Sequence, residues 1–262
     1  MAAEPDKPSP ARMYDYFLGG YHNFAIDRQA AEQIIALYPD ASLAARTNRA
    51  FLRRAVTFLA QQGVDQFLDL GSGIPTAGHV HEVAQRIHSD TRVVYVDIDP
   101  VAVAFSQNIL QETPSVVAIA GDVRMPDEVL NHSEVQRVID FGRPLAILMV
   151  ALLQFVPNDG EAQRVVEQLL ASAPVGSYLA LSHVTNEYLP AEVREQSEAI
   201  YARSTNPSKL RSQAQIARLF AGLDLVEPGI VLVPQWRPGA SDDLFLDAPE
   251  RSMFFAGVGR KS

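Results

Sequence analysis

The sequence predicts a mixed α/β protein built on a mostly parallel sheet. From residue 66 onward, short apolar runs alternate with segments whose apolar residues recur at helical spacing, a pattern typical of strand–helix–strand units. Of the 262 residues, 47% are hydrophobic and only 20% are charged, so the chain can bury a substantial core. We therefore expect one structural unit, in which residues 1–62 pack as helices on a core formed by residues 63–262.

The N-terminal segment predicts a lead-in followed by two helices. Residues 1–12 are rich in Pro, Ala and charged side chains, which indicates a flexible start. Residues 28–38 and 42–62 carry apolar positions at helical spacing, and Gly63 is placed to end the second helix.

Five apolar runs predict the parallel strands, at residues 67–70, 93–96, 116–120, 145–150 and 177–182. Helices are expected between them. Val80, Val83 and Ile87 fall on one helical face, and Asn158 with Glu161 resembles the start of another helix.

The C-terminal part follows a different pattern. Residues 190–221 are helix-like, and two further strand candidates, at 229–233 and 253–258, are separated by a polar loop rich in Pro, Gly and Asp. Two late strands with no helix between them predict an antiparallel hairpin that completes the sheet.

Composition excludes several classes of protein. The chain has no cysteine, which rules out disulfides, thiolate zinc sites, iron–sulfur clusters and a cysteine nucleophile, and favours the cytoplasm. A net charge of −9 without a dense Lys/Arg block argues against a nucleic-acid partner. Residues 145–153 form the longest apolar run, which is too short to span a bilayer, and the start of the chain lacks a signal peptide. We therefore expect a soluble protein with no membrane partner.

A Gly-x-Gly turn follows the first predicted strand, at Gly71-Ser72-Gly73. Glycines at such a place let the backbone turn sharply and let a ligand approach with no Cβ in the way. Taken alone, the motif is equally consistent with a tight strand–helix turn.

Acidic residues follow the next two strands. Asp97 ends the second, where a carboxylate can accept hydrogen bonds from ribose hydroxyls, and Asp99 either helps it or caps the helix that begins at Pro100. Asp122 follows the third strand and could receive the amine of an adenine. Its alternative is a helix cap before Pro126.

The glycine turn also limits the kind of ligand. Thr76 stands where a dinucleotide fingerprint needs its third glycine, with Pro75 before it, and the chain has no Gly-Lys-Ser/Thr sequence of a P-loop. These departures count against a nicotinamide-dependent oxidoreductase. An adenosine-containing ligand without a pyrophosphate is therefore expected.

These motifs resemble class I S-adenosylmethionine-dependent methyltransferases, whose first motif is an apolar strand, an aspartate and Gly-x-Gly. The chain is also similar to the DUF574-like group of that superfamily at residues 10–20, 81–85, 94–100, 204–207, 210–212 and 256–261. The resemblance implies a Rossmann-like class I methyltransferase fold, with a mostly parallel seven-stranded sheet, an antiparallel C-terminal hairpin and an N-terminal helical lid. It implies S-adenosylmethionine as the cofactor and an unidentified small-molecule acceptor of the methyl group. The alternative is a non-catalytic sensor or interaction protein that binds S-adenosylmethionine.

The same resemblance implies which residues bind the cofactor. Those implied for its methionine portion are Asp69, Gly71, Ser72 and Gly73, and those implied for its ribose and adenine are Asp97, Asp99, Asp122 and Val123. Residues 14–23 look like a lid over the cofactor, with Tyr14, Gly19 and Asn23 as its contacts. The alternative is that the aromatic residues of this segment only pack against the helices behind them.

The segment after the fourth strand departs from two patterns. Enzymes that methylate amino groups of nucleic-acid bases commonly carry Asn/Asp-Pro-Pro-Tyr/Phe there, whereas residues 149–155 read Met-Val-Ala-Leu-Leu-Gln-Phe. Many small-molecule enzymes of the class have histidine where this chain has Gln154. The first departure weakens methylation of nucleic-acid bases as a function, and the second leaves no general base at this position.

Methyl transfer from a sulfonium is an in-line displacement, so alignment and desolvation are the main tasks of the protein. A hydroxyl acceptor would still need a general base, for which the candidates are His22, His183 and Tyr14. Each of them can also be purely structural.

Two further groups of residues are candidates for a metal site or a substrate pocket. His79 and His81 lack a carboxylate at metal-ligand spacing, so we expect no metal. Trp236-Arg237, with Asp242 and Asp243 nearby, either shapes a substrate pocket or belongs to a solvated loop with one anchoring aromatic residue.

Overall fold

An eight-stranded sheet forms the centre of the structure, a computed structural model that describes residues 5–74, 78–110, 114–239 and 244–262. The strands are β1 Gln66–Leu70, β2 Arg92–Asp97, β3 Val116–Ala120, β4 Ala146–Val150, β5 Tyr178–Val184, β6 Asp224–Leu225, β7 Val231–Leu232 and β8 Phe254–Arg260. Their order is β3-β2-β1-β4-β5-β8-β6, and β7 also pairs with β8. All pairs among β1 to β5 are parallel, which confirms the five predicted parallel strands.

Helices cover both faces of this sheet. They are α1 Pro10–Phe17, α2 Ala25–Leu37, α3 Ala41–Gln61, α4 Val80–Gln85, α5 Pro100–Ile109, α6 Pro126–Leu130, α7 Ser133–Val138, α8 Asp159–Ser172, α9 Ala191–Tyr201 and α10 Gln213–Arg218, with 3₁₀ turns at Leu153–Phe155, Val233–Gln235 and Pro249–Ser252. Side chains of α3 and α4 share a core with Phe67 and Val93, whereas those of α7, α8 and α10 pack with Leu68 and Val94. Because neighbouring strand residues point to opposite faces, strands buried on both sides read as unbroken apolar runs.

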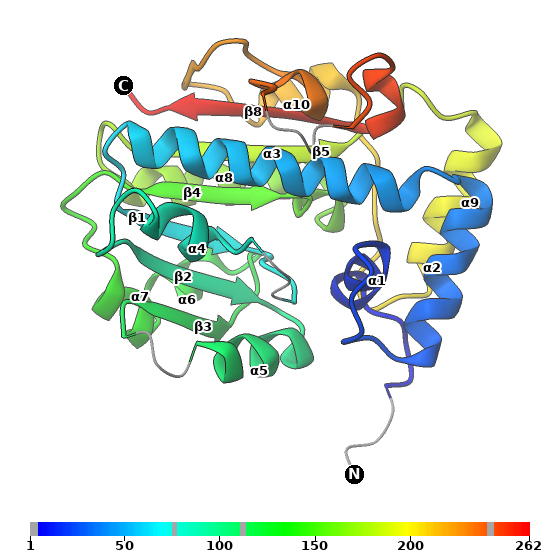
Figure 1. Cartoon of the computed structure of the whole chain (residues 1–262), viewed down its shortest axis with the longest axis horizontal. Helices are drawn as coiled ribbons and strands as arrows, with labels where there is room; N and C mark the ends of the chain where they lie inside the picture. The colour runs from blue at the N-terminus through cyan, green and yellow to red at the C-terminus, as the bar shows by residue number, and fades with distance from the viewer. Residues whose placement is uncertain (1–4, 75–77, 111–113, 240–243) are drawn as a thin grey trace.

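Beyond the carboxyl ends of the parallel strands lies a third group of helices, α1, α2 and α9 (Figure 1). They have a small core of their own that includes Met13, Phe17, Ile34 and Ile200. The order of the strands reverses between β1 and β4, and open α/β sheets bind ligands in the crevice at such a point. These helices therefore face the edge of the sheet at which a ligand is expected.

The start of the chain differs from the prediction. The expected flexible lead-in is wrong for residues 8–12, because α1 begins at Pro10 and the side chains of Ser9 and Arg12 are buried. A proline at the first helical position suits the start of a helix, since its missing N–H has no partner there in any case. Arg12 is held by ion pairs with two distant carboxylates, Asp27 and Asp99, which the local sequence pattern does not reveal.

The C-terminal end of the sheet is antiparallel, as predicted, although it is built from three strands. β6 and β7 have two residues each and both pair with β8. Both residues of β6 are exposed, so this strand leaves no apolar pattern in the sequence. The helix-like stretch predicted over 190–221 is two helices, α9 and α10, because Pro207 lies in the segment between them. In the described ranges, no helix combines the length and the apolar character needed to cross a bilayer.

Candidate active site

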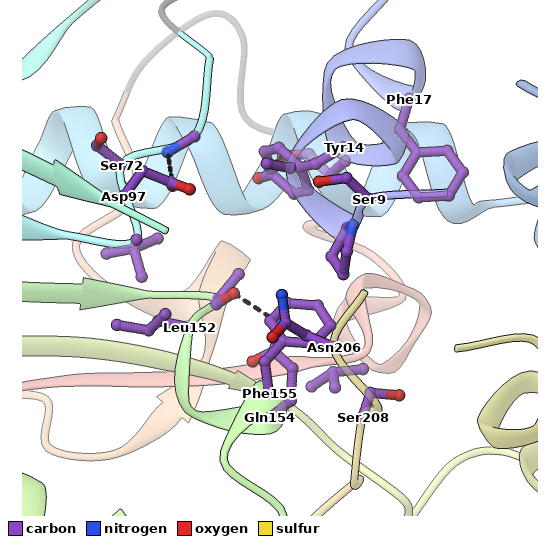
Figure 2. Close-up of a pocket in the computed structure, with 18 of the residues that line it drawn as sticks. Ser9, Tyr14, Phe17, Ser72, Asp97, Leu152, Gln154, Phe155, Asn206 and Ser208 are labelled. Atoms are coloured by element: carbon purple, nitrogen blue, oxygen red, sulfur yellow. Dashed lines mark hydrogen bonds between the residues drawn. The ribbon is translucent and has the colours of Figure 1, made fainter. Parts of the chain in front are cut away.

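A cavity of about 220 Å³ lies at the carboxyl edge of the sheet, between the strand ends and the helices α1, α2 and α9. Figure 2 shows Ser72 and Asp97 on one side of it and Phe155, Asn206 and Ser208 on another, with Tyr14, Ser9 and Phe17 of the N-terminal segment above the latter group in this view. Most of the residues implied for the cofactor line this cavity: Tyr14, Asp69, Gly71, Ser72, Gly73, Asp97, Asp99, Asp122 and Val123.

The glycine turn closes one side of the cavity. Gly71 and Gly73 have φ angles of 65° and 66°, a region that other residues rarely adopt. A Cβ on Gly71 would lie 2.5 Å from Cδ1 of Leu152, whereas a Cβ on Gly73 would have no described atom within 4 Å. Gly71 is therefore needed for close packing against the turn after β4. The open space beside Gly73 is a cradle that a ligand can fill.

Asp97 ties the end of β2 to this turn. Its Oδ2 accepts a hydrogen bond from the Gly73 N–H at 2.7 Å, and its Oδ1 accepts one from the Asp99 N–H at 2.8 Å. Burial raises the pKa of Asp97 to about 6. Each carboxylate oxygen can accept a second hydrogen bond, so the group is placed to receive two hydroxyls from the cavity.

Opposite charges meet under the turn. Asp69, at the end of β1, is buried, and this burial raises its pKa to about 7 although Arg49 of α3 lowers it. The buried Nε of Arg49 has no hydrogen-bond partner among the described residues. Buried donors in proteins are normally paired, so this N–H, on a residue that lines the cavity, is placed to donate to a ligand. Asp69 and Arg49 offer one acidic and one basic group to the cavity, which suits a zwitterionic amino-acid moiety.

The acidic residues after β2 and β3 have local partners as well. Oδ1 of Asp99 accepts the Val101 N–H at 2.8 Å and caps α5, while its Oδ2 pairs with Arg12 at 2.7 Å. Asp99 therefore has the structural role of a cap and an ion-pair partner in addition to lining the cavity. Asp122 is held by the guanidinium of Arg124, with the closest atoms 2.6 Å apart, and this lowers the pKa of Asp122.

The comparisons with known proteins agree with this geometry. A family model described as S-adenosyl methyltransferase matches residues 2–262. The chain belongs to this family. None of the curated proteins compared matches it. Two solved structures are similar to this chain over almost its whole length. One is a Thermobifida fusca protein described as a candidate methyltransferase, with 39% identity and a TM-score of 0.91 over 98% of this chain and 96% of that one. The other is a DUF574 family protein from Streptomyces avermitilis, with 37% identity and a TM-score of 0.92 over 98% of each chain.

Both the predicted fold and the predicted family are thereby confirmed. A methyltransferase from Methanosarcina mazei, at 13% identity and TM-score 0.50 over 76% of this chain and 92% of that one, shares the Rossmann-like class I fold. The enzyme is an S-adenosylmethionine-dependent methyltransferase, as its family is. The unpaired Arg49 and the open cradle at Gly73 fit the amino-acid end of that cofactor, and Asp97 fits its ribose.

In this methyltransferase, only part of the predicted lid segment reaches the cavity. Tyr14 lines it, but the Tyr14 hydroxyl donates to the Ala45 carbonyl at 3.0 Å and accepts from Asn48 at 3.0 Å. Gly19 and Asn23 are not among the lining residues. Asn23 instead donates from Nδ2 to Oδ2 of Asp15 at 2.8 Å, so it holds the chain after α1 in its turn.

His183 and His22, two of the three candidate bases, lie outside the cavity lining, whereas Tyr14 is part of it. His183 is fully buried, its Nδ1 donates to the Val184 carbonyl at 2.7 Å, and its Nε2 accepts from Arg211 at 2.8 Å. Burial lowers the pKa of His183 to about 3, so its ring stays neutral and both nitrogens are engaged. The His22 ring packs against the Phe105 ring, with the two ring centroids 4.2 Å apart.

The remaining predicted groups have structural surroundings. His79 and His81 stack with their ring centroids 5.4 Å apart. Trp236 is fully buried and packs edge-to-face with Phe51, which supports the anchoring role over the pocket role. Pro75, Thr76, Asp242 and Asp243 lie outside the described residues.

The sequence analysis assigned no binding role to the residues at the other end of the cavity. They come from three separate segments: Ser9 and Phe17, then Gln154 and Phe155, then Asn206, Ser208 and Leu210. The similarity to the DUF574-like group included residues 204–207 but assigned them no role. Only the fold brings these segments together, so the sequence holds no local motif for them.

Proposed function

We propose that this enzyme transfers the methyl group of S-adenosylmethionine to a small molecule that is enclosed in the same cavity. The observation that carries the proposal is that one cavity joins the glycine turn at Gly71 to an apolar end that includes Phe155 and Phe254. The cofactor would fill the first part, and an acceptor must enter the second to reach the methyl group.

Three charged residues have distinct parts in this proposal. The ribose hydroxyls donate to Asp97, the ammonium of the methionine portion faces Asp69, and its carboxylate pairs with Arg49. Charge-assisted hydrogen bonds of this kind are about twice as strong as neutral ones, so these three contacts fix the cofactor in place.

When bound, the cofactor supplies an electrophilic methyl group on a sulfonium. The chain then has to align an acceptor with that methyl group and keep water away. Apolar side chains of α1, α2 and α9 face the strand ends and are suited to both tasks. For this reason we also assign residues 1–62 to the same structural unit as the sheet.

The lack of cysteine supports a cytoplasmic location for this enzyme.

The test is calorimetric titration of the purified protein with S-adenosylmethionine and S-adenosylhomocysteine. We expect both to bind, and Asp97→Ala to weaken binding by about a hundredfold or more, since two hydrogen bonds to a charged group are lost. Asp127→Ala, at an exposed position of α6, is the matched control and should leave the affinity unchanged. If the unmodified protein bound neither compound, the proposal would be overturned. Binding without methyl transfer to any small molecule of a metabolite pool would favour the sensor alternative.

A further inference from the structure

The apolar end of the cavity contains neutral polar groups, and we call this region the acceptor end. Its apolar lining includes Phe17, Phe155, Tyr201, Leu210 and Phe254, and its polar side chains include Gln154, Asn206 and Ser208. Figure 2 shows Gln154, Phe155, Asn206 and Ser208 gathered on the side of the pocket away from Ser72.

Gln154 presents an unused hydrogen-bond acceptor at this end. Its Nε2 donates to the Ala151 carbonyl at 2.8 Å. A carbonyl oxygen can only accept, so the amide nitrogen must face Ala151 and the amide oxygen must face away. That oxygen, Oε1, is buried and has no partner among the described residues, and the whole residue is only 5% exposed. Leaving a buried acceptor unpaired is costly, which points to a donor on a ligand.

The backbone around Gln154 is held rigidly. Arg211 donates from its two terminal nitrogens to the carbonyls of Leu153 and Val156, each at 2.7 Å, and the Lys209 N–H donates to the Gln154 carbonyl at 2.8 Å. Gln154 lies in a 3₁₀ turn, and these hydrogen bonds hold the backbone of that turn on both sides of Gln154. The amide oxygen is therefore preorganised, as a group that orients a substrate should be.

The residue that receives the Gln154 amide is itself in an unusual conformation. Ala151 has a φ of 55°, in the left-handed region, and its N–H donates to both the carbonyl and the hydroxyl of Ser182 at 3.0 Å. Backbone strain of this kind persists where the surroundings over-determine it, often at functional sites.

We propose that Gln154 Oε1 accepts a hydrogen bond from an N–H of the methyl acceptor, and that this acceptor is an uncharged nitrogen attached to an aromatic ring system. The inference rests on the proposed function and adds the substrate class. Aromatic side chains such as Phe155 and Phe254 suit a flat apolar body, and the unpaired amide oxygen suits an N–H donor.

Nitrogen fits this end better than a hydroxyl for a chemical reason. A hydroxyl must lose its proton to a base before or during attack. Gln154, Asn206 and Ser208 do not take up protons, and burial raises the pKa of Tyr201. The carboxylate of Asp15, which also lines the cavity, already accepts hydrogen bonds from the His22 N–H at 2.9 Å and from Nδ2 of Asn23 at 2.8 Å. An aryl nitrogen attacks with its free electron pair, which forms the new N–C bond. The C–S bond breaks at the same time, sulfur keeps the electron pair of that bond, and the proton on nitrogen passes to water afterwards.

The first experiment measures binding to the complex with S-adenosylhomocysteine, by ligand-observed NMR. The probes are indoline, which has a ring N–H, and 2,3-dihydrobenzofuran, which has the same shape with an ether oxygen in its place. We expect indoline to bind about tenfold more tightly, as one hydrogen bond to a buried acceptor provides. Gln154→Met should abolish the difference, with Gln154→Leu as a second variant, and both should keep their affinity for S-adenosylhomocysteine.

The matched control is Gln136→Met. Gln136 also donates from Nε2 to a backbone carbonyl, that of Leu130 at 2.7 Å, but it lies on α7 outside the cavity lining. This variant should discriminate between the two probes as the unmodified protein does.

The second experiment incubates the enzyme with S-adenosylmethionine and either indoline or 2-naphthol, and detects methylated products by mass spectrometry. We expect N-methylindoline and no methyl ether. Equal binding of the two ring probes, no binding of either, discrimination that survives at Gln154→Met, or methylation of the naphthol alone would each overturn the inference. Since all these outcomes presuppose binding of S-adenosylhomocysteine, loss of that binding would instead overturn the proposed function.

Discussion

The two sides of the cavity are built in different ways. On the strand side, Asp97 bonds to the backbone of Gly73 and Asp99, so residues that follow neighbouring strands hold one another. On the helix side, Arg12 of α1 reaches Asp99 after β2, and the Thr205 N–H donates to the Pro8 carbonyl across almost the whole sequence. The cofactor side thus depends on backbone turns at the sheet edge. The opposite side depends on a few buried contacts between distant segments.

Removing the ion pairs of Arg12 on the helix side should give the largest effect, a loss of protein stability. Arg12 is 4% exposed and pairs with Asp27 at 2.8 Å and with Asp99 at 2.7 Å. Arg12→Met leaves two buried carboxylates without their partner, and the loss of one partner of a buried pair costs about 3–5 kcal/mol. We expect the free energy of unfolding, measured by urea denaturation, to fall by about that amount.

Arg251→Met is the control for this prediction. Arg251 pairs with Asp40 at 2.8 Å, but its side chain is 52% exposed. Exposed ion pairs contribute about 0–1 kcal/mol, so this variant should be close to the unmodified protein in stability. Similar losses for both variants would contradict the view that Arg12 is what holds α1 over the cavity.

The same contrast explains what the sequence could predict. The five parallel strands are largely buried on both faces, so each leaves a mostly apolar run; the glycine turn follows the run of β1, and Asp97 ends β2 directly after its apolar run. Gln154 is noticed in the sequence only through the family resemblance, which implies no role for it. Its orientation depends on Ala151, and its backbone depends on Arg211, which lies in the link between α9 and α10 that the sequence pattern assigned to a helix. Likewise, His183 follows the predicted strand 177–182 at the correct edge of the sheet, but its pairing with Arg211 could not be predicted from the sequence.

A smaller effect is expected on the strand side, from the protonation of Asp69. Its pKa of about 7 means that the carboxylate is largely neutral below that pH. The ionised form attracts the ammonium of S-adenosylhomocysteine, so affinity should rise with pH up to about 7 and then level off. Below that pH we expect a loss of up to about tenfold per pH unit. Asp97, with a pKa of about 6, should steepen the loss further below pH 6.

Calorimetric titrations of the unmodified protein and of Asp69→Asn would measure how the affinity depends on pH. A range from about pH 5.5 to about pH 8.5 spans about one and a half pH units on either side of the Asp69 pKa. Asp69→Asn should bind more weakly at high pH and lose the step near neutrality, whereas Asp127→Asn should keep it. A step of unchanged size in Asp69→Asn would assign the titration to another group and separate Asp69 from the ammonium.

The smallest effect should come from Asp122, at the rim of the strand side. Its carboxylate is already paired with Arg124, and its side chain is 27% exposed, so water competes for any hydrogen bond that it makes to adenine. Asp122→Ala should therefore weaken binding of S-adenosylhomocysteine by only about threefold, within the range of one net hydrogen bond. Arg124→Ala keeps the carboxylate and frees it from its partner, so this variant should bind at least as tightly as the unmodified protein. A loss at Asp122 as large as that at Asp97 would show that the cofactor side is anchored at its rim as firmly as at its buried centre, and the contrast between buried and exposed carboxylates would no longer explain how the site is built.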